Sequence, residues 1–274
     1  MEHRKALTIA GSDTSGGAGM EADLKTFQEL GVYGMTALTC IVTMTPDAWS
    51  HSITLLDSEL LRKQLSTILD GIGVDAMKTG MLGSPEAIKI ASAAIESHQL
   101  KNVVIDPVMV CKGAEEELQP ELEPQSTAAY RQYLLPKALI TTPNLYEASK
   151  LTGMGWISSV ADMKEAAAKL VALGAKHALV KGGARLKNSS KALDVLYDGK
   201  TFTIIAEDKV DTPNIHGAGC TYAAAITAGL AKGMSVVEAV RLAKTFVTAG
   251  IRESFGLNAF TGPTDHSAYR HMRA

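Results

Sequence analysis

Apolar positions along the chain follow two periods, one typical of buried strands and the other of amphipathic helices. Short runs rich in β-branched residues predict strands, and longer runs with apolar residues three or four apart predict helices. The predicted strands are Ala6–Ala10, Thr36–Met44, Asp75–Lys78, Val103–Asp106, Ala138–Thr141 and His177–Lys181, with a hairpin formed by Val195–Tyr197 and Phe202–Ile205. The predicted helices are Met20–Leu30, Asp57–Leu69, Pro85–Ser97, Ala161–Leu173, Thr221–Ala231 and Val236–Arg252, with Asp57 and Ser84 as N-caps.

Repeated alternation of strands with helices predicts an α/β fold with a doubly wound, mostly parallel sheet and helices on both faces. No linker or internal repeat divides the sequence, so we expect one domain over residues 1–274. One segment, at about residues 111–126, has three consecutive glutamates, two prolines and little apolar periodicity. This composition predicts a small solvated flap.

Polar motifs stand at the ends of several predicted strands. Ligands of open α/β sheets bind beyond the carboxyl ends of the strands, so these motifs are expected to meet in one site. They are Gly11-Ser12-Asp13, Asp106, Asn144 with Glu147, and Lys181-Gly182-Gly183. Asp106 and Glu147 could hold Mg²⁺, which favours one or two carboxylates plus water and phosphate, or could be a cap and a surface acid. Lys181 could contact phosphate or be an ordinary strand-end lysine.

The segment Gly217-Ala218-Gly219-Cys220, here called the anion turn, opens a small-residue helix. Its glycines let backbone N–H groups approach a ligand, and the N-terminus of a helix favours negative charge. Cys220 falls in the first helical turn, where the pKa of a thiol is expected to be lowered. The segment indicates group transfer, or alternatively a Gly-rich loop before a core helix. The neighbouring His216 is expected to be structural.

A second Gly-rich segment, Gly16-Gly17-Ala18-Gly19, here called the glycine loop, comes soon after the first strand. With Ala22 it approaches a dinucleotide fingerprint, but the glycines do not follow the strand directly and the second strand ends without a ribose-binding acid. A loop that lines a substrate is therefore favoured. Asp23, in the following helix, is expected to be solvated or, alternatively, to face a ligand. The chain has no complete Walker A loop, which argues against a P-loop NTPase.

Composition narrows the function further. The 274 residues carry a net charge of −2, which argues against a nucleic-acid or membrane surface as the main partner. No apolar run is long enough to span a membrane, and the N-terminus has no signal-peptide pattern. The three cysteines, Cys40, Cys111 and Cys220, form no metal-type pair and suggest no disulfide framework. We therefore expect a reducing cytoplasm.

Motifs that match those of a known superfamily run in order along nearly the whole chain. They are Leu7–Asp13, Ser15–Gly19, Ala22–Phe27, Lys78–Leu82, Asp106–Met109, Thr142–Ala148, Lys181–Gly183 and His216–Thr221. Together they resemble the ribokinase-like superfamily, and within it the vitamin kinases that act on pyridoxal and on hydroxymethylpyrimidine. The resemblance implies a kinase that uses ATP and Mg²⁺.

The resemblance also implies a role for each matching residue. The catalytic residues would be Cys220, Cys111, Gly217, Ala218 and Gly219, with the anion turn receiving the transferred phosphoryl group. The nucleotide would be bound by Asn144, Lys181, Gly182, Thr212, Gly217 and Gly219, and Mg²⁺ by Asp106 and Glu147. The vitamin pocket would be lined by Gly19, Asp23, Met44, His51, Gly80, Val108 and Cys111. Cysteine at position 220, where many superfamily members place an aspartate base, fits this branch.

Two residues bear on the choice of vitamin. Pyrimidine kinases commonly carry glutamine at the position that matches Met44, and methionine cannot hydrogen-bond to an aminopyrimidine. Cys111 resembles the second active-site cysteine of a subgroup of pyridoxal kinases. Both features favour pyridoxal, with pyridoxine and pyridoxamine as further substrates. The alternatives are a hydroxymethylpyrimidine kinase, a nicotinamide-dependent oxidoreductase and a non-catalytic vitamin-binding protein. A homodimer is a further expectation.

Overall fold

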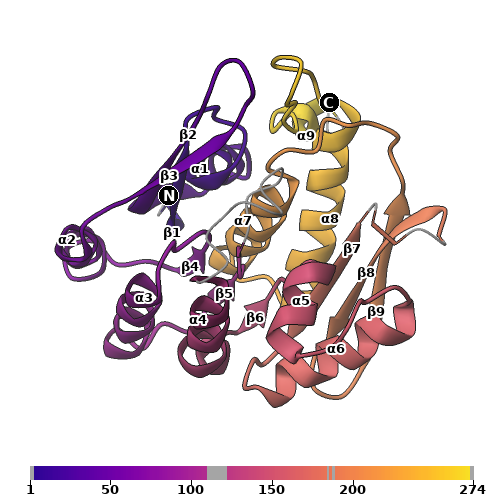
Figure 1. The fold of residues 1–274 in the computed structure, drawn as a ribbon. Helices are drawn as coiled ribbons and strands as arrows, with labels where there is room; N and C mark the ends of the chain where they lie inside the picture. The colour runs from indigo at the N-terminus through magenta and orange to yellow at the C-terminus, as the bar shows by residue number, and fades with distance from the viewer. Residues whose placement is uncertain (1–2, 110–121, 184, 187–188, 272–274) are drawn as a thin grey trace.

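The structure is a computed structural model that describes residues 3–109, 122–183, 185–186 and 189–271. Within these residues one sheet of nine strands runs in the order β3-β2-β1-β4-β5-β6-β7-β8-β9 (Figure 1). The strands are β1 Lys5–Asp13, β2 Tyr33–Met44, β3 His51–Leu55, β4 Ala76–Thr79, β5 Val103–Ile105, β6 Ile140–Thr141, β7 Ala178–Gly183, β8 Lys191–Tyr197 and β9 Phe202–Asp208. The adjacent strands β2, β1, β4, β5, β6 and β7 pair in parallel. Strand β3 at one edge and strands β8 and β9 at the other pair antiparallel. The expected α/β sheet is confirmed.

Helices cover both faces of this sheet. They are α1 Gly19–Glu29, α2 Ser58–Leu69, α3 Pro85–Ser97, α4 Leu122–Ala129, α5 Leu145–Thr152, α6 Val160–Ala172, α7 Ala218–Ala231, α8 Val236–Arg252 and α9 Ala268–His271. A π-helical turn at Tyr130–Leu134 and a 3₁₀ turn at Leu135–Lys137 follow α4. The core packs α1, α7 and α8 on one face and α2 to α6 on the other.

The two faces follow from the two-residue period of the strands. In β5, Val103 and Ile105 belong to the hydrophobic cluster under α2 to α6, whereas Val104 between them belongs to the cluster under α1, α7 and α8. In β7, Leu179 likewise belongs to the cluster under α1, α7 and α8. Because both faces are covered, most positions of the central strands are apolar, which is why several of these strands appear as apolar runs in the sequence.

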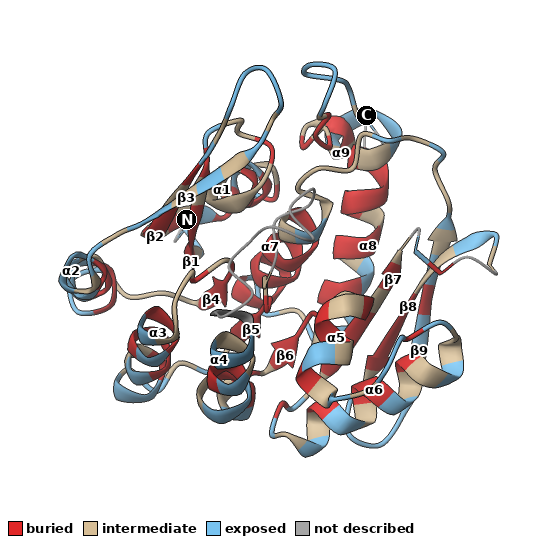
Figure 2. Cartoon of the chain, in the orientation of Figure 1, coloured by how far each residue is buried: buried red, intermediate tan, exposed pale blue. Residues whose placement is uncertain are grey.

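Helix α7 lies in the middle of the sheet face that α1, α7 and α8 cover. Every residue of it from Thr221 to Ala231 is buried (Figure 2). Small side chains allow the close packing: a Cβ at Gly229 would lie 2.9 Å from the Cβ of Ala239 in α8. The helix is thus fixed in the core from Thr221 onward, while its N-terminal residues, which form the anion turn, are half-buried or exposed.

The observed elements refine the expected ones. The caps are confirmed, since Asp57 Oδ1 accepts from Glu59 N at 2.9 Å and Ser84 Oγ accepts from Ala87 N at 3.1 Å. Strand β3 and the helices α4, α5 and α9 were not expected. Residues 122–126 of the expected flap lie in α4, and the flap itself stays a prediction. Its remaining residues up to 121 lie outside the described part of the chain.

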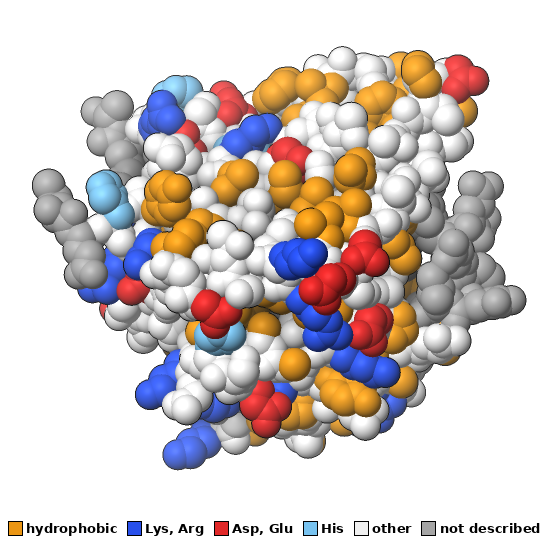
Figure 3. All heavy atoms as spheres, turned by 90° about the vertical axis from the view of Figure 1, so that its left-hand side faces the viewer, with side chains coloured by type: hydrophobic (Ala, Val, Ile, Leu, Met, Phe, Trp, Pro, Cys, Tyr) orange, Lys and Arg blue, Asp and Glu red, His pale blue; other side chains and the backbone are white. Residues whose placement is uncertain are grey.

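The surface agrees with the low net charge. On the face shown in Figure 3, basic and acidic side chains interleave among small apolar groups. Within the described residues, no helix has the length and apolar character needed to cross a membrane. The cytoplasmic location and the homodimer stay predictions.

Candidate active site

The anion turn takes a conformation that suits glycine. Gly217 is the N-cap of α7 with φ +75°, in the left-handed region. A Cβ at this position would lie 1.8 Å from the carbonyl oxygen of Gly17 in the glycine loop, so no side chain fits. Gly219 is exposed, and helix geometry leaves its N–H and that of Cys220 without a carbonyl partner inside α7. The N–H of Ala218 donates to Ile215 O at 3.2 Å and is engaged already.

The ends of β5, β6 and β7 place polar groups beside the anion turn, as the sequence predicted. Lys181 Nζ lies 3.6 Å from where a Cβ of Gly219 would stand, and it donates to Asp106 Oδ1 at 2.9 Å. Thr142 Oγ1 donates to the same oxygen at 2.8 Å. Burial acts to lower the pKa of Lys181, but the charges of Asp106 and Glu147 raise it above its ordinary value. The lysine therefore stays a cation next to the turn.

Glu147 stands at the third position of α5 in a capping box. Its carboxylate accepts from Asn144 N at 2.8 Å, and Asn144 Oδ1 accepts from Glu147 N at 2.9 Å. Burial, with a contribution from Asp106, raises the pKa of Glu147 to about 7 against the opposing charge of Lys181. No group of three or more His, Cys, Asp or Glu that could hold a metal is found in the part of the chain described. Two buried carboxylates nevertheless fit an Mg²⁺ ion that keeps water and phosphate ligands.

Asp23 is fully buried, which corrects the expectation that it is solvated. Its Oδ2 accepts from Lys78 Nζ at 2.7 Å and from Thr8 Oγ1 at 2.6 Å. Its Oδ1 is buried without a hydrogen-bond partner among the described residues. Lys78 also lies near Gly80, since a Cβ there would stand 3.4 Å from the ammonium. Sequence reasoning gave Lys78 no role, because the pairing of two residues 55 positions apart has no local signal.

The thiol of Cys220 departs from expectation. Burial raises its pKa to about 12, although the Lys78 ammonium and a backbone hydrogen bond from Gly19 oppose the shift. The expected lowering at a helix N-terminus is therefore wrong here, because the cost of removing a thiolate from water exceeds the gain from neighbouring positive charge. Cys220 keeps its proton at neutral pH in the ligand-free protein.

The glycine loop and the anion turn are joined by a pair of side chains. His216 Nε2 lies 2.6 Å from Asp13 Oδ2, at the end of β1. In the β2–β3 hairpin, Met44 pairs with His51. Burial and the charge of His216 lower the pKa of His51, although Asp13 opposes this. The structure therefore brings His51 into the surroundings of Asp13 and His216.

Four of the remaining predicted residues lie within the described part of the chain. Gly19 begins α1, where a Cβ would lie 2.4 Å from Gly11 O, and half-buried Val108 follows β5. Gly182 and Thr212 have partners in the protein: Gly182 N donates to Asp194 Oδ1 at 3.1 Å, and Thr212 Oγ1 accepts from Asn214 N. Cys111 lies outside the described residues.

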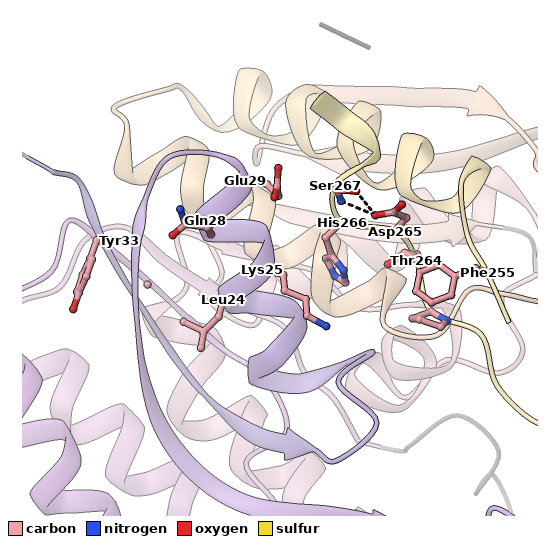
Figure 4. A pocket seen from close by; sticks show the side chains of 12 residues that line it. Leu24, Lys25, Gln28, Glu29, Tyr33, Phe255, Thr264, Asp265, His266 and Ser267 are labelled. Atoms are coloured by element: carbon pink, nitrogen blue, oxygen red, sulfur yellow. Dashed lines mark hydrogen bonds between the residues drawn. The ribbon is translucent and has the colours of Figure 1, made fainter. Parts of the chain in front are cut away.

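A cavity of about 600 Å³ lies elsewhere, between α1 and the C-terminal segment (Figure 4). Lys25, Phe255 and His266 are among its lining residues, and no residue predicted for the active site is. Its wall borders the glycine loop, since Lys25 Nζ donates to Gly16 O at 2.6 Å and a Cβ at Gly17 would lie 3.1 Å from the Cβ of Pro263. The chemistry of the site is therefore assigned to the strand ends and the anion turn.

Known proteins share this sequence and fold. The family model described as phosphomethylpyrimidine kinase matches residues 13–265. A pyridoxine kinase of Bacillus subtilis is 58% identical, with 98% of each chain covered, and a hydroxymethylpyrimidine/phosphomethylpyrimidine kinase of the same organism is 42% identical, with 97% of this chain and 96% of that one covered. The structure of the pyridoxal kinase from Staphylococcus aureus in complex with AMP-PCP and pyridoxal is 50% identical with a TM-score of 0.92, and 99% of this chain and 96% of that one are covered. With the family match extending over most of the sequence, the chain belongs to the phosphomethylpyrimidine kinase family of ribokinase-like vitamin kinases.

Proposed function

We propose that this protein transfers the γ-phosphoryl group of ATP to the hydroxymethyl group of pyridoxal, and also of pyridoxine and pyridoxamine. The observation that carries the proposal is the anion turn at the N-terminus of α7, with the Lys181–Asp106 pair beside it. The relatives support the same reading, because the Staphylococcus aureus pyridoxal kinase with this fold has been captured with AMP-PCP and pyridoxal.

The chain supplies positive potential where charge develops during transfer. The N–H groups of Gly219 and Cys220 point from the end of α7, and Lys181 adds a full charge next to them. Fixed donors of this kind stabilise the transferred group without reorganising during the reaction. Asp106 and Glu147 would hold Mg²⁺, which when bound neutralises charge on the nucleotide phosphates.

Cys220 acts on the acceptor hydroxyl in its protonated form. A thiol with a pKa of about 12 is not a ready base at neutral pH. Its sulfur can accept a hydrogen bond and orient the hydroxyl toward the phosphorus. Phosphoryl transfer passes through a loose transition state, so orienting the hydroxyl matters more than removing its proton early.

Met44 favours pyridoxal over the pyrimidine. It stands at the end of β2, opposite His51, and its thioether offers no donor to an aminopyrimidine ring. Hydroxymethylpyrimidine is the second candidate substrate, because the matching family model is described by that chemistry and one relative at 42% identity has it.

ADP formation with pyridoxal, pyridoxine, pyridoxamine and hydroxymethylpyrimidine, each offered alone, tests the proposal. We expect turnover with the three pyridines. Cys220→Ala should lower kcat by about 10²-fold, since a misplacement of about 1 Å in a reacting group can cost that much, with little change in ATP affinity. Turnover with the pyrimidine alone would replace the substrate assignment, and full activity in Cys220→Ala would remove Cys220 from the mechanism.

A further inference from the structure

The glycine loop and the anion turn meet backbone against backbone. A Cβ at Gly217 would lie 1.8 Å from Gly17 O, and a Cβ at Gly17 would lie 2.5 Å from His216 Cδ2. Each loop therefore fills the space that a side chain of the other would need. At such close contact, a shift of either loop moves its partner, because packed interiors have no slack.

A side-chain hydrogen bond lies beside this contact. His216 Nε2 donates to Asp13 Oδ2 at 2.6 Å, between residues 203 positions apart. The same carboxylate accepts from Ser15 N and from Ala18 N, each at 2.9 Å. Asp13 is an ionised acceptor: although burial opposes it, hydrogen bonds from His216 and Ser15 lower its pKa to about 2. The carboxylate thus shapes the glycine loop and holds the first residue before the anion turn.

The bond lies next to the reacting groups without belonging to them. Gly217 follows His216 directly, and a backbone hydrogen bond links Gly19, at the end of the glycine loop, to the thiol of Cys220. On the other side of His216, Thr264 N donates to its carbonyl oxygen at 3.3 Å, so its backbone is held as well.

We propose that Asp13 and His216 are positioning residues that hold the anion turn in register with the glycine loop for phosphoryl transfer. The inference rests on the proposed function, because it assumes that the anion turn receives the transferred group. The pair acts through the position of the Gly219 and Cys220 N–H groups. A displacement of about 1 Å in such groups can lower a rate by about 10²-fold.

Two amide substitutions of His216 separate this role from general packing. The amide nitrogen of glutamine can reach the place of Nε2, whereas that of asparagine is too short. We expect His216→Asn to lower kcat by about 10²-fold with the KM for ATP little changed, and His216→Gln to recover most of the loss. Asp13→Asn places an N–H₂ group against N–H donors and should resemble His216→Asn. The double variant should lose no more than either single one, since contacting residues are not additive.

A matched pair elsewhere in the chain gives the control. His98 Nε2 lies 2.8 Å from Asp70 Oδ1 at an exposed site, and His98→Asn should leave kcat unchanged. Thermal unfolding shows whether each variant is folded, and Asp13→Asn carries the test if His216→Asn is not. A wild-type kcat in a folded His216→Asn or Asp13→Asn variant would overturn the proposal. Equal losses in His216→Asn and His216→Gln would overturn it as well. Failure of the wild type on pyridoxal would contradict the proposed function instead, and the variants would then be compared on whichever alcohol is phosphorylated.

Discussion

At the scale of single residues, two buried carboxylates of the site, Asp13 and Glu147, have pKa values shifted in opposite directions. Asp13 accepts from two backbone N–H groups and from His216, and its pKa falls to about 2. Glu147 is buried near a second carboxylate, and its pKa rises to about 7. Donors stabilise the ionised form, and desolvation and like charge destabilise it. Asp13 is therefore a fixed anion of the framework, whereas Glu147 can gain or lose a proton near neutral pH.

The raised pKa of Glu147 predicts a pH-dependent stability in the absence of metal and nucleotide. The folded form holds the proton more tightly than the unfolded chain, so the contribution is complete below pH 4.5 and is lost as the pH rises toward about 7. Glu147→Gln keeps a cap acceptor and escapes this loss. The variant should therefore gain stability over the wild type by on the order of 3 kcal/mol between about pH 4.5 and 8. Parallel unfolding curves for the two proteins would contradict this.

Cys111 gives a second residue-level prediction, drawn from the sequence alone. A thiol can add to the aldehyde of pyridoxal as a reversible hemithioacetal, and pyridoxine has no aldehyde. Cys111→Ala should therefore impair phosphorylation of pyridoxal much more than that of pyridoxine, with both rates measured in the same preparation. Equal losses would restrict Cys111 to a general role near the site, and no loss would place it outside the site.

At the scale of elements, one buried carboxylate joins two strands and two helices. Asp194 on β8 binds Lys244 Nζ of α8 at 2.7 Å, the hydroxyl of Tyr222 on α7 at 3.1 Å and the N–H of Gly182 on β7 at 3.1 Å. The helix that begins with the anion turn is thereby connected to the strand that ends with Lys181. The position of the anion turn relative to Lys181 therefore depends on this cluster.

Removing the cation of this cluster should cost far more than removing an exposed one. Lys244→Met leaves the Asp194 carboxylate buried without its cation, which typically costs about 3–5 kcal/mol. Lys191→Met is the matched control, because Lys191 lies on the same strand as Asp194 and pairs with Asp208 at 2.5 Å in solvent, where an ion pair contributes little to stability. Urea unfolding of both variants measures the difference. Equal losses would mean that the buried pair is not what connects these elements.

At the scale of the whole molecule, the sequence predicts what depends on local pattern. The sheet follows from periodicity, and the gathering of Asp106, Asn144 and Lys181 follows from the shared edge of parallel strands. Strand β3 was missed because it is a short edge strand whose residues are largely solvent-exposed. Helix α5 had a usable signal, since Asn144 with Glu147 three residues later is a capping-box pattern.

The pairs that organise the site could not be predicted in this way. Asp13 with His216, Asp23 with Lys78, and Asp194 with Lys244 lie far apart in sequence and meet only in the folded chain. The high pKa of Cys220 escaped for the same reason. The N-terminal position of the thiol in α7 can be predicted locally, but its desolvation and the charges of Asp23, Lys78 and Asp106 that act on it cannot.

Competition between the two candidate vitamins tests whether the site prefers pyridoxal. Pyridoxal and hydroxymethylpyrimidine are supplied together at equal concentration with limiting ATP and Mg²⁺, and the two phosphate esters are quantified by mass spectrometry. The product ratio gives the ratio of kcat/KM without separate kinetic constants. We predict that pyridoxal 5′-phosphate dominates, and that Met44→Gln, which introduces an amide opposite His51, shifts the ratio toward the pyrimidine. A wild-type ratio that favours the pyrimidine would contradict the account.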